Sequence, residues 1–298
     1  MKNNLGGVYV DLITPFDEKG KVNYNKLKWL IENAINAKIN GVALLSNVSE
    51  EYSLTEKEKE KIVKFAIKVI KNRVKIFIYV GGNNFKKVSC EIKKFNNLKI
   101  NAFLLNLPEN CSPNFSGLQL YILNCLKLTN IPFILVNSPK RTGLLLSIKQ
   151  FNKLCVSSEN IIGIKDESNS LEFFNKLTKI KPNFKVYCGN DEVIDGALRL
   201  GSVGIISYSA NICANEINKI YMLYDQLKIK EAQIVFLKIE EFINALNFDN
   251  LPASIKFAFA SLGQKMGYTR LPIAGIELEN KAVIREALTT CNIKITLN

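Results

Sequence analysis

Two cations that follow apolar runs could together act on a small carbonyl acid. Lys165 comes directly after the apolar run Ile161–Ile164. A lysine at the end of a buried strand is partly desolvated, which favours its neutral amine, and a neutral amine can attack a ketone to form a Schiff base. Arg141 lies in the segment 137–143, after another apolar run, and its planar guanidinium suits a substrate carboxylate. The alternative for both residues is an ordinary solvated cation.

The absence of histidine from all 298 residues excludes several other kinds of site. No Ser-His-Asp triad, Cys-His pair, histidine-ligated zinc or histidine proton shuttle can be built. The seven cysteines are widely spaced and include no CxxC pair, which excludes zinc knuckles and thioredoxin-type motifs. Acid–base chemistry therefore falls to lysine, tyrosine, carboxylate or cysteine side chains, to water or to the substrate.

The positive charge of the chain is dispersed. The net charge is +13, yet only five of the 40 Lys and Arg residues are arginines, and the lysines are spread along the whole chain. Proteins that read nucleic acids concentrate their charge and use arginine for base contacts. The composition therefore favours solvated lysine faces over a nucleic-acid surface. The chain also lacks a signal-peptide core and any apolar run long enough to span a membrane, so we expect a cytoplasmic protein.

The elements that must position these cations follow from a regular alternation. Eight apolar runs of strand length recur, and amphipathic segments with helical spacing separate them. The runs are 8–14, 42–45, 74–80, 102–107, 132–137, 161–165, 185–188 and 204–207. The helical segments are 23–37, 55–72, 86–96, 118–127, 147–156, 170–180 and 193–200, and a Thr55-x-x-Glu58 capping box opens the second.

Eight such units in sequence predict an α/β fold, a (β/α)8 TIM barrel with a C-terminal helical extension. A doubly wound sheet is the alternative, but the chain has no glycine motif for phosphate binding after an early strand. Further helices are expected over 214–226, 230–246, 253–266 and 280–289. We therefore predict a barrel over residues 1–225 and a helical extension over residues 226–298.

Active groups of such a barrel lie at the carboxyl ends of its strands. This rule retains Lys165 and Arg141, and it adds the segments 46–50, 189–192 and 207–211.

Several of these strand ends resemble motifs of the dihydrodipicolinate synthase / N-acetylneuraminate lyase family, the pyruvate-dependent class I aldolases. The match runs nearly end to end, and its order and spacing are more specific than any single motif. The matching segments are Leu12–Phe16, Asn137–Gly143, Gly163–Asp166, Gly189–Asp191, Gly204–Asn211 and Arg270–Pro272.

The resemblance implies that Lys165 condenses with the ketone of pyruvate or a related α-keto acid. The iminium then serves as an electron sink, and the enamine adds to an aldehyde or is released by cleavage of a carbon–carbon bond. No metal or organic cofactor is needed, and a homotetramer or homodimer is expected. The substrate-binding residues implied are Arg141, Asn47, Val48, Tyr208, Ile206, Gly189 and Asp191.

Two features indicate different branches of this family. The Arg-Thr-Gly sequence at 141–143 is similar to that of dihydrodipicolinate synthases, in which the arginine holds the carboxylate of aspartate semialdehyde. The Asp191-Glu192 pair instead resembles lyases of N-acetylneuraminate or 2-keto-3-deoxy sugar acids, whose longer substrates form hydrogen bonds there.

The chain departs from the family in its proton relay. The family's G-T-T-G-E motif aligns with residues 46–50, where Asn47 and Val48 replace both hydroxyl side chains. Val136 replaces the tyrosine that ends the fifth strand, and Asn110 replaces another tyrosine.

Valine cannot transfer a proton, so either the relay is lost or another group supplies it. Tyr208 and Tyr187, near the ends of the eighth and seventh strands, are the candidates from the sequence. The backbone amides of Asn47 and Val48 can still bind a carboxylate.

Three hypotheses follow. The first is an active lyase or aldolase with Lys165 as nucleophile and an altered relay. The second is a catalytically weak barrel that binds keto acids. The third, from the charge, is a binder of nucleic acids or anionic surfaces.

Overall fold

The computed structural model describes residues 5–294, and it confirms the predicted barrel. Eight parallel strands are neighbours in chain order and close into a barrel. The strands are β1 (Gly7–Asp11), β2 (Gly41–Leu44), β3 (Lys75–Gly81), β4 (Ala102–Asn106), β5 (Phe133–Asn137), β6 (Ile161–Asp166), β7 (Lys185–Cys188) and β8 (Gly204–Ser207). Each overlaps a predicted run, because strands covered on both faces are nearly continuous in apolar residues.

The helices also follow the predicted periodicity. They are α1 (Tyr24–Asn36), α2 (Glu56–Ile70), α3 (Phe85–Phe95), α4 (Phe115–Leu126), α5 (Pro139–Thr142), α6 (Ile148–Val156), α7 (Leu171–Leu177), α8 (Ile194–Arg199), α9 (Ala210–Asp225), α10 (Ile229–Leu246), α11 (Leu251–Ser261) and α12 (Leu278–Thr290). Two 3₁₀ turns, η1 (Glu51–Ser53) and η2 (Asp191–Val193), follow β2 and β7.

One helix prediction was wrong in detail, and one short helix was missed. The helix expected over 253–266 ends at Ser261, and Gly263 follows with a φ of +79°, a conformation that suits glycine and ends a helix. The short helix α5 was not predicted, because its four residues are too few to show a period. The predicted capping box is confirmed: the Glu58 amide donates to Thr55 Oγ1 at 3.3 Å, and the Thr55 amide donates to Glu58 Oε2 at 2.9 Å.

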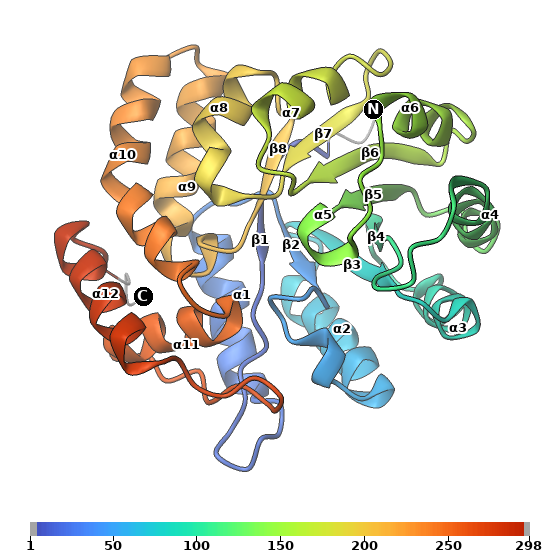
Figure 1. Ribbon diagram of the computed structural model, residues 1–298. Coiled ribbons are helices and arrows are strands. Elements are labelled where there is room, and N and C mark those ends of the chain that lie inside the picture. Colours follow the sequence, from blue (N-terminus) through green and yellow to red (C-terminus); the bar gives the residue numbers. More distant parts are fainter. Residues whose placement is uncertain (1–4, 295–298) are drawn as a thin grey trace. The chain divides into compact units, whose positions relative to one another are not determined.

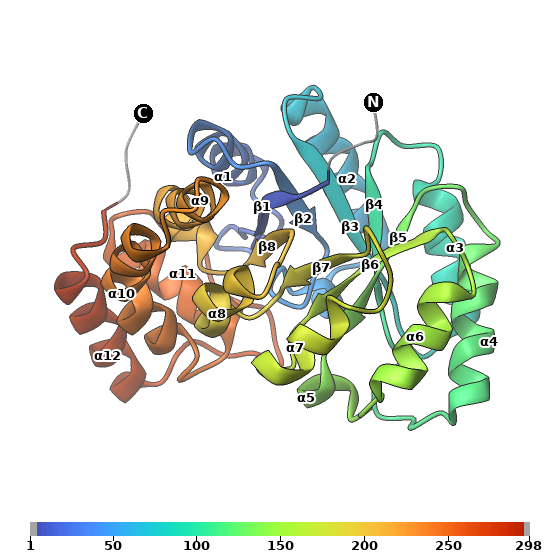
Figure 2. The ribbon, with the colours of Figure 1, turned by 90° about the horizontal axis from the view of Figure 1, so that it is seen from above.

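The chain forms two compact units. Unit 1 contains residues 75–206 and the described residues 5–6, and unit 2 contains residues 7–74 and 207–294. In unit 1, β3 to β6 lie side by side with α3 and α4 next to them (Figure 1). In unit 2, α10 packs against α9 and α12, and these helices lie together in orange and red (Figure 2). The predicted boundary at residue 225 stays a prediction.

The strand register in unit 1 decides which side chains face the interior. A bulge in β6 shifts its pairing with β5, so that Phe133 pairs with Ile161 but Val136 pairs with Lys165. A shift of one residue moves side chains to the other face of a sheet. The bulge therefore places Lys165 in the same interior row as Val136.

The rest of this interior row follows from the neighbouring pairs. Asn106 of β4 pairs with Val136, Gly81 of β3 pairs with Asn106, and Tyr187 of β7 pairs with Lys165. We call these five residues the lysine row.

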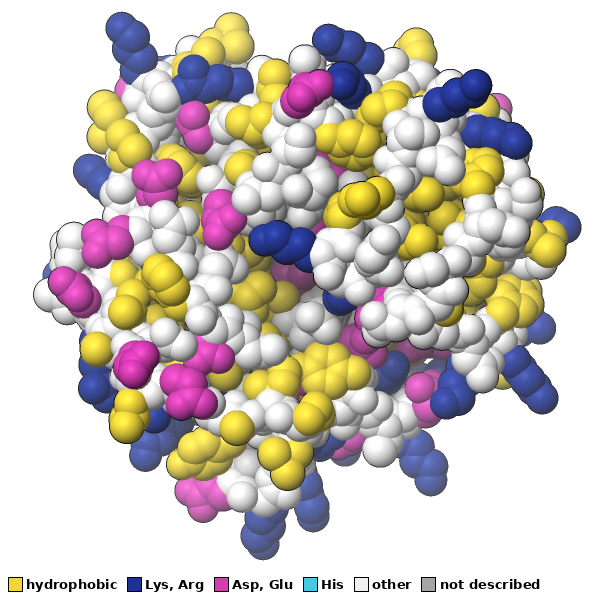
Figure 3. All heavy atoms as spheres, viewed as in Figure 1, with side chains coloured by type: hydrophobic (Ala, Val, Ile, Leu, Met, Phe, Trp, Pro, Cys, Tyr) yellow, Lys and Arg dark blue, Asp and Glu magenta, His cyan; other side chains and the backbone are white. Residues whose placement is uncertain are grey.

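The surface agrees with the dispersed charge of the sequence. On the face shown in Figure 3, Lys and Arg side chains are spaced mostly around the rim and do not gather in one patch. Within residues 5–294, none of the helices is long and apolar enough to cross a membrane.

Candidate active site

Lys165 lies inside unit 1 and is held by two oxygen groups. Its side chain is 4% exposed, and its Nζ donates to Glu167 Oε1 at 2.6 Å and to the phenol oxygen of Tyr79 at 2.7 Å. The centre of the Tyr79 ring lies 5.3 Å from Nζ, so the amine lies off the hydroxyl end of the ring and not over its face. A buried lysine is costly unless it is paired, and these contacts supply the pairing.

Glu167 is the acidic partner and the more open of the two charges. Its side chain is 23% exposed, and its backbone amide donates to the Asn137 carbonyl at 2.8 Å. Burial alone would raise the pKa of Glu167, but the positive charges of Lys165 and Arg141 outweigh it and hold that pKa below its usual value. Glu167 is therefore a carboxylate at neutral pH.

Tyr79 reaches Lys165 from β3, on the other side of the interior. Tyr79 pairs with Leu104 of β4, which places it in the interior row beneath the lysine row. The side chain is 3% exposed. Gly81, two residues further along β3, has no side chain in the lysine row, and Val136 is short there. The long tyrosine side chain can therefore extend upward to the amine.

Gly189, the residue that follows β7, packs against the Lys165 side chain. A Cβ atom built on Gly189 would lie 2.6 Å from Lys165 Cε and 2.9 Å from Glu167 Cγ. Real Cβ atoms essentially never come this close, so a larger residue at this position would force the side chains of Lys165 and Glu167 to shift. Gly189, which the resemblance implied as a substrate-binding residue, thus fixes the position of the Lys165 side chain.

Arg141 lies on α5 with its guanidinium engaged by two partners. Its Nε lies 3.0 Å from Glu109 Oε1, and its Nη2 donates to Asn106 Oδ1 at 3.1 Å. The side chain remains 20% exposed. A substrate carboxylate that binds Arg141 would have to share the guanidinium with Glu109 or replace it.

A second carboxylate, Asp166, braces the end of β6. Asn137 Nδ2 donates to Asp166 Oδ1 at 2.6 Å, and Ser168 Oγ donates to Asp166 Oδ2 at 2.8 Å. Burial raises the pKa of Asp166, although these hydrogen bonds oppose the shift. The brace holds the two strand ends that carry Lys165 and Arg141.

Unit 2 carries the loop expected to bind a carboxylate through its amides. Val48 is buried and Asn47 is exposed. Two backbone hydrogen bonds stabilise the turn: the Ser49 amide donates to the Ser46 carbonyl, and the Glu50 amide donates to the Asn47 carbonyl.

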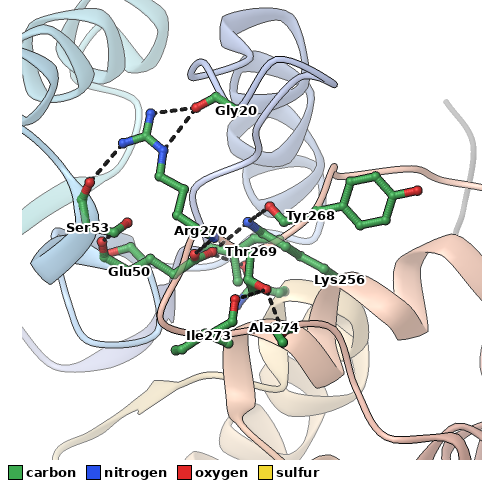
Figure 4. A network of polar contacts seen from close by, with 12 residues as sticks. Gly20, Glu50, Ser53, Lys256, Tyr268, Thr269, Arg270, Ile273 and Ala274 are labelled. Atoms are coloured by element: carbon green, nitrogen blue, oxygen red, sulfur yellow. Dashed lines mark hydrogen bonds and ion pairs between the residues drawn. The ribbon is translucent and has the colours of Figure 1, made fainter.

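A buried network fixes the end of this loop (Figure 4). Glu50 is fully buried with a φ of +57°, and it accepts bonds from Lys256 Nζ at 2.6 Å and from the Arg270 amide at 2.8 Å. Arg270 also donates from Nη2 to the Gly20 carbonyl at 2.6 Å and from Nη1 to the Ser53 carbonyl at 2.9 Å. The backbone strain at Glu50 is therefore held by several surrounding bonds.

Lys256 is buried and paired with a glutamate, as Lys165 is. It also donates to the Tyr268 carbonyl at 3.1 Å and lies 4.1 Å from the centre of the Phe16 ring. Burial lowers the pKa of Lys256 to about 8, although the charge of Glu50 opposes the shift.

The other predicted site residues are buried. Ile206 is a fully buried residue of β8, and Asp191, in η2, is also fully buried. The Tyr208 phenol accepts a bond from Asn247 Nδ2 at 2.7 Å within unit 2. The Tyr187 phenol donates to the Leu5 carbonyl at 3.0 Å. In these hydrogen bonds, the phenols of the two tyrosines that the sequence offers as relay substitutes are bonded to Asn247 and Leu5 and not to Lys165.

Sequence reasoning missed Tyr79 and Glu109. Tyr79 lies inside an apolar run, where a tyrosine usually packs as a hydrophobic residue. Its alternation with Gly81 at the strand end was the available signal, because residues two apart share a face. Glu109 lies in the loop after β4, and its sequence context gave no signal of a partner.

Comparison with known proteins identifies the family of the chain. The family model of the dihydrodipicolinate synthetase family matches residues 4–291. A 4-hydroxy-tetrahydrodipicolinate synthase of Wigglesworthia glossinidia brevipalpis is 30% identical over 294 residues, which are 98% of this chain and 98% of that protein.

Solved structures have the same fold. The chloride-inhibited dihydrodipicolinate synthase of Acinetobacter baumannii, complexed with pyruvate, is 26% identical with a TM-score of 0.93, over 97% of this chain and 99% of that one. A dihydrodipicolinate synthase variant described as monomeric has a TM-score of 0.93 over 97% of both chains, and at 21% identity it shows the fold alone. The chain belongs to the dihydrodipicolinate synthetase family and is a lyase of the class I aldolase type.

Proposed function

We propose that this protein condenses pyruvate with aspartate semialdehyde through a Schiff base on Lys165, as a dihydrodipicolinate synthase with an altered proton relay. The observation that carries the proposal is the Lys165 amine, which is buried at the end of β6 between a carboxylate and a phenol. A desolvated amine with proton-transfer partners in contact is what a carbonyl condensation requires.

The carboxylates of the two substrates would be held by different groups. The family resemblance assigns the pyruvate carboxylate to the amides of Asn47 and Val48, and backbone donors do not depend on the side chain. Arg141 suits the carboxylate of the aldehyde, because a guanidinium binds a carboxylate through two parallel bonds. Glu109 would release Arg141 when that substrate arrives.

The alternatives have weaker support. Asp191 indicated a longer sugar-acid substrate and is fully buried, whereas the side chain of Arg141, which indicates aspartate semialdehyde, is 20% exposed. A barrel that binds keto acids without turnover would have no need of a phenol on the lysine amine. The homotetramer or homodimer and the cytoplasmic location remain predictions.

Reduction with borohydride in the presence of pyruvate tests the proposal. Mass spectrometry of the digested protein should find the reduced pyruvate adduct on Lys165, and the K165M variant should form none. Addition of aspartate semialdehyde to the unreduced protein should then consume pyruvate. Absence of the adduct from the wild-type protein would reject the Schiff-base mechanism, and an adduct without turnover of the aldehyde would reject this acceptor.

A further inference from the structure

Tyr79 contacts the reacting atom of the proposed Schiff base. Its phenol oxygen lies 2.7 Å from Lys165 Nζ, and both side chains are almost fully buried. Val136, where the family resemblance expects a tyrosine, is the neighbour of Lys165 in the lysine row and has no group that can carry a proton. The phenol therefore reaches the amine from β3 instead of from β5.

We propose that the Tyr79 phenol is the acid–base group of Schiff-base formation on Lys165. This inference rests on the proposed function and assigns the proton transfer to a residue outside the motifs that the sequence resemblance supplied.

The proton balance of the condensation needs only one such group. An alkylammonium has three N–H protons, and the iminium retains one of them. The other two must leave with the ketone oxygen as water. The phenol relays each proton: it takes one from the nitrogen as it gives its own hydroxyl proton to the oxygen. In the first relay the ammonium loses a proton and the ketone oxygen gains one as the nitrogen attacks, which gives a carbinolamine with a protonated nitrogen. In the second relay that nitrogen loses a proton and the hydroxyl gains one and departs as water, so the phenol ends each relay in its original state.

Acid strength favours the phenol over Glu167, the other group in contact. Phenols and alkylammonium ions are acids of similar ordinary strength, so proton exchange between them is nearly balanced. Lys165 and Arg141 keep Glu167 a carboxylate, which makes it a weak base and a steady counter-charge. Glu167 thus holds the ammonium while Tyr79 exchanges the proton.

The test compares Y79F with two matched variants. Y79F keeps the ring and removes only the hydroxyl, so we expect the folded protein to form the borohydride-trapped adduct with pyruvate about 10²–10⁴-fold more slowly. Y187F removes a buried phenol of the lysine row that bonds to the Leu5 carbonyl, and its trapping rate should stay close to wild type. E167Q keeps the phenol and should slow trapping less than Y79F does.

Three outcomes overturn the assignment. Y79F that traps pyruvate at the wild-type rate shows that the phenol transfers no proton. E167Q that is slower than Y79F assigns the transfer to the carboxylate. Y187F that is as slow as Y79F shows a general effect of losing an interior hydroxyl. The wild-type protein is measured first: if it forms no adduct, the proposed function fails, whereas an adduct with an unimpaired Y79F rejects the role of Tyr79 alone.

Discussion

Among residues 5–294, two buried lysines are each paired with a glutamate, and the two pairs look alike locally. In unit 1 Lys165 lies 2.6 Å from Glu167, and in unit 2 Lys256 lies 2.6 Å from Glu50, and each lysine side chain is 4% exposed. The glutamates differ, because Glu167 is 23% exposed and Glu50 is fully buried. Burial and pairing alone therefore do not identify a catalytic lysine.

The second partner of each lysine marks the difference. Lys165 has a phenol, which can exchange protons, and the side chain of its carboxylate partner Glu167 is 23% exposed. Lys256 has the Tyr268 carbonyl and the face of the Phe16 ring, which can only hold a cation. Under the proposed function, the first pair is arranged to lose a proton to a reaction, and the second is arranged to keep the loop end at Glu50 in place.

The largest expected effect separates the two lysines by activity. K165M should lower kcat by more than about 10⁴-fold, a loss of the size seen when an enzyme loses its nucleophile. K256M, measured in the temperature range where it is folded, should still form the pyruvate adduct on Lys165. Steady-state rates and borohydride trapping check both. An adduct on Lys256, or full activity in K165M, would show that the pairs had been assigned the wrong way round.

The order reverses when stability is measured. K256M leaves the fully buried Glu50 without its cation, so its free energy of unfolding should fall by about 3–5 kcal/mol. K165M should lose less, since Glu167 keeps its partial exposure and the nearby charge of Arg141. Urea denaturation of the three proteins checks this. K256M/E50M, with both charges removed, should recover part of the loss, and an equal loss in both single variants would contradict the comparison.

The pH dependence of stability should come from Lys256. Its pKa is about 8 in the folded protein and near 10.5 when unfolded, so between these values the unfolded chain binds more protons. Stability therefore rises with pH through this window, and the cost of the buried ammonium is present below it. The free energy of unfolding of wild type minus that of K256M should increase by up to roughly 3 kcal/mol between pH 7 and 10.5. A constant difference would contradict the lowered pKa.

Most of the fold was predictable because it depends on periodicity. Buried parallel strands such as β6 are apolar throughout, and α2 shows both its stripe and its capping box. The end of α11 was not predictable from the stripe, since an apolar pattern continues to Met266 while the backbone turns at Gly263.

The candidate site also has residues that the sequence could predict and residues that it could not. Lys165 and Arg141 could be located because strand ends are visible in the sequence. Tyr79 could not, because its contact depends on the register of β3 to β6 and on the bulge in β6. Glu109 and Lys256 are partners that only tertiary packing brings to Arg141 and Glu50.

The smallest expected effects distinguish two glycines that the sequence does not tell apart. A Cβ on Gly189 would lie 2.6 Å from Lys165 Cε, so G189A should displace the lysine and lower kcat by about 10–100-fold with little loss of stability. A Cβ on Gly267 would lie 2.1 Å from the Phe16 carbonyl oxygen at a φ of +80°. G267A should therefore lower the free energy of unfolding by about 1–3 kcal/mol.

The two variants are controls for each other, measured by trapping and by urea denaturation. The pyruvate adduct should form normally in folded G267A. Gly267 packs against Phe16, whose ring lies next to Lys256, and not against the Lys165 amine. If G189A unfolds as easily as G267A while its trapping rate is unchanged, Gly189 only supports the fold. The Lys165 amine would then react at the normal rate even when its side chain is displaced. The exact position of that side chain next to β7 would not affect catalysis.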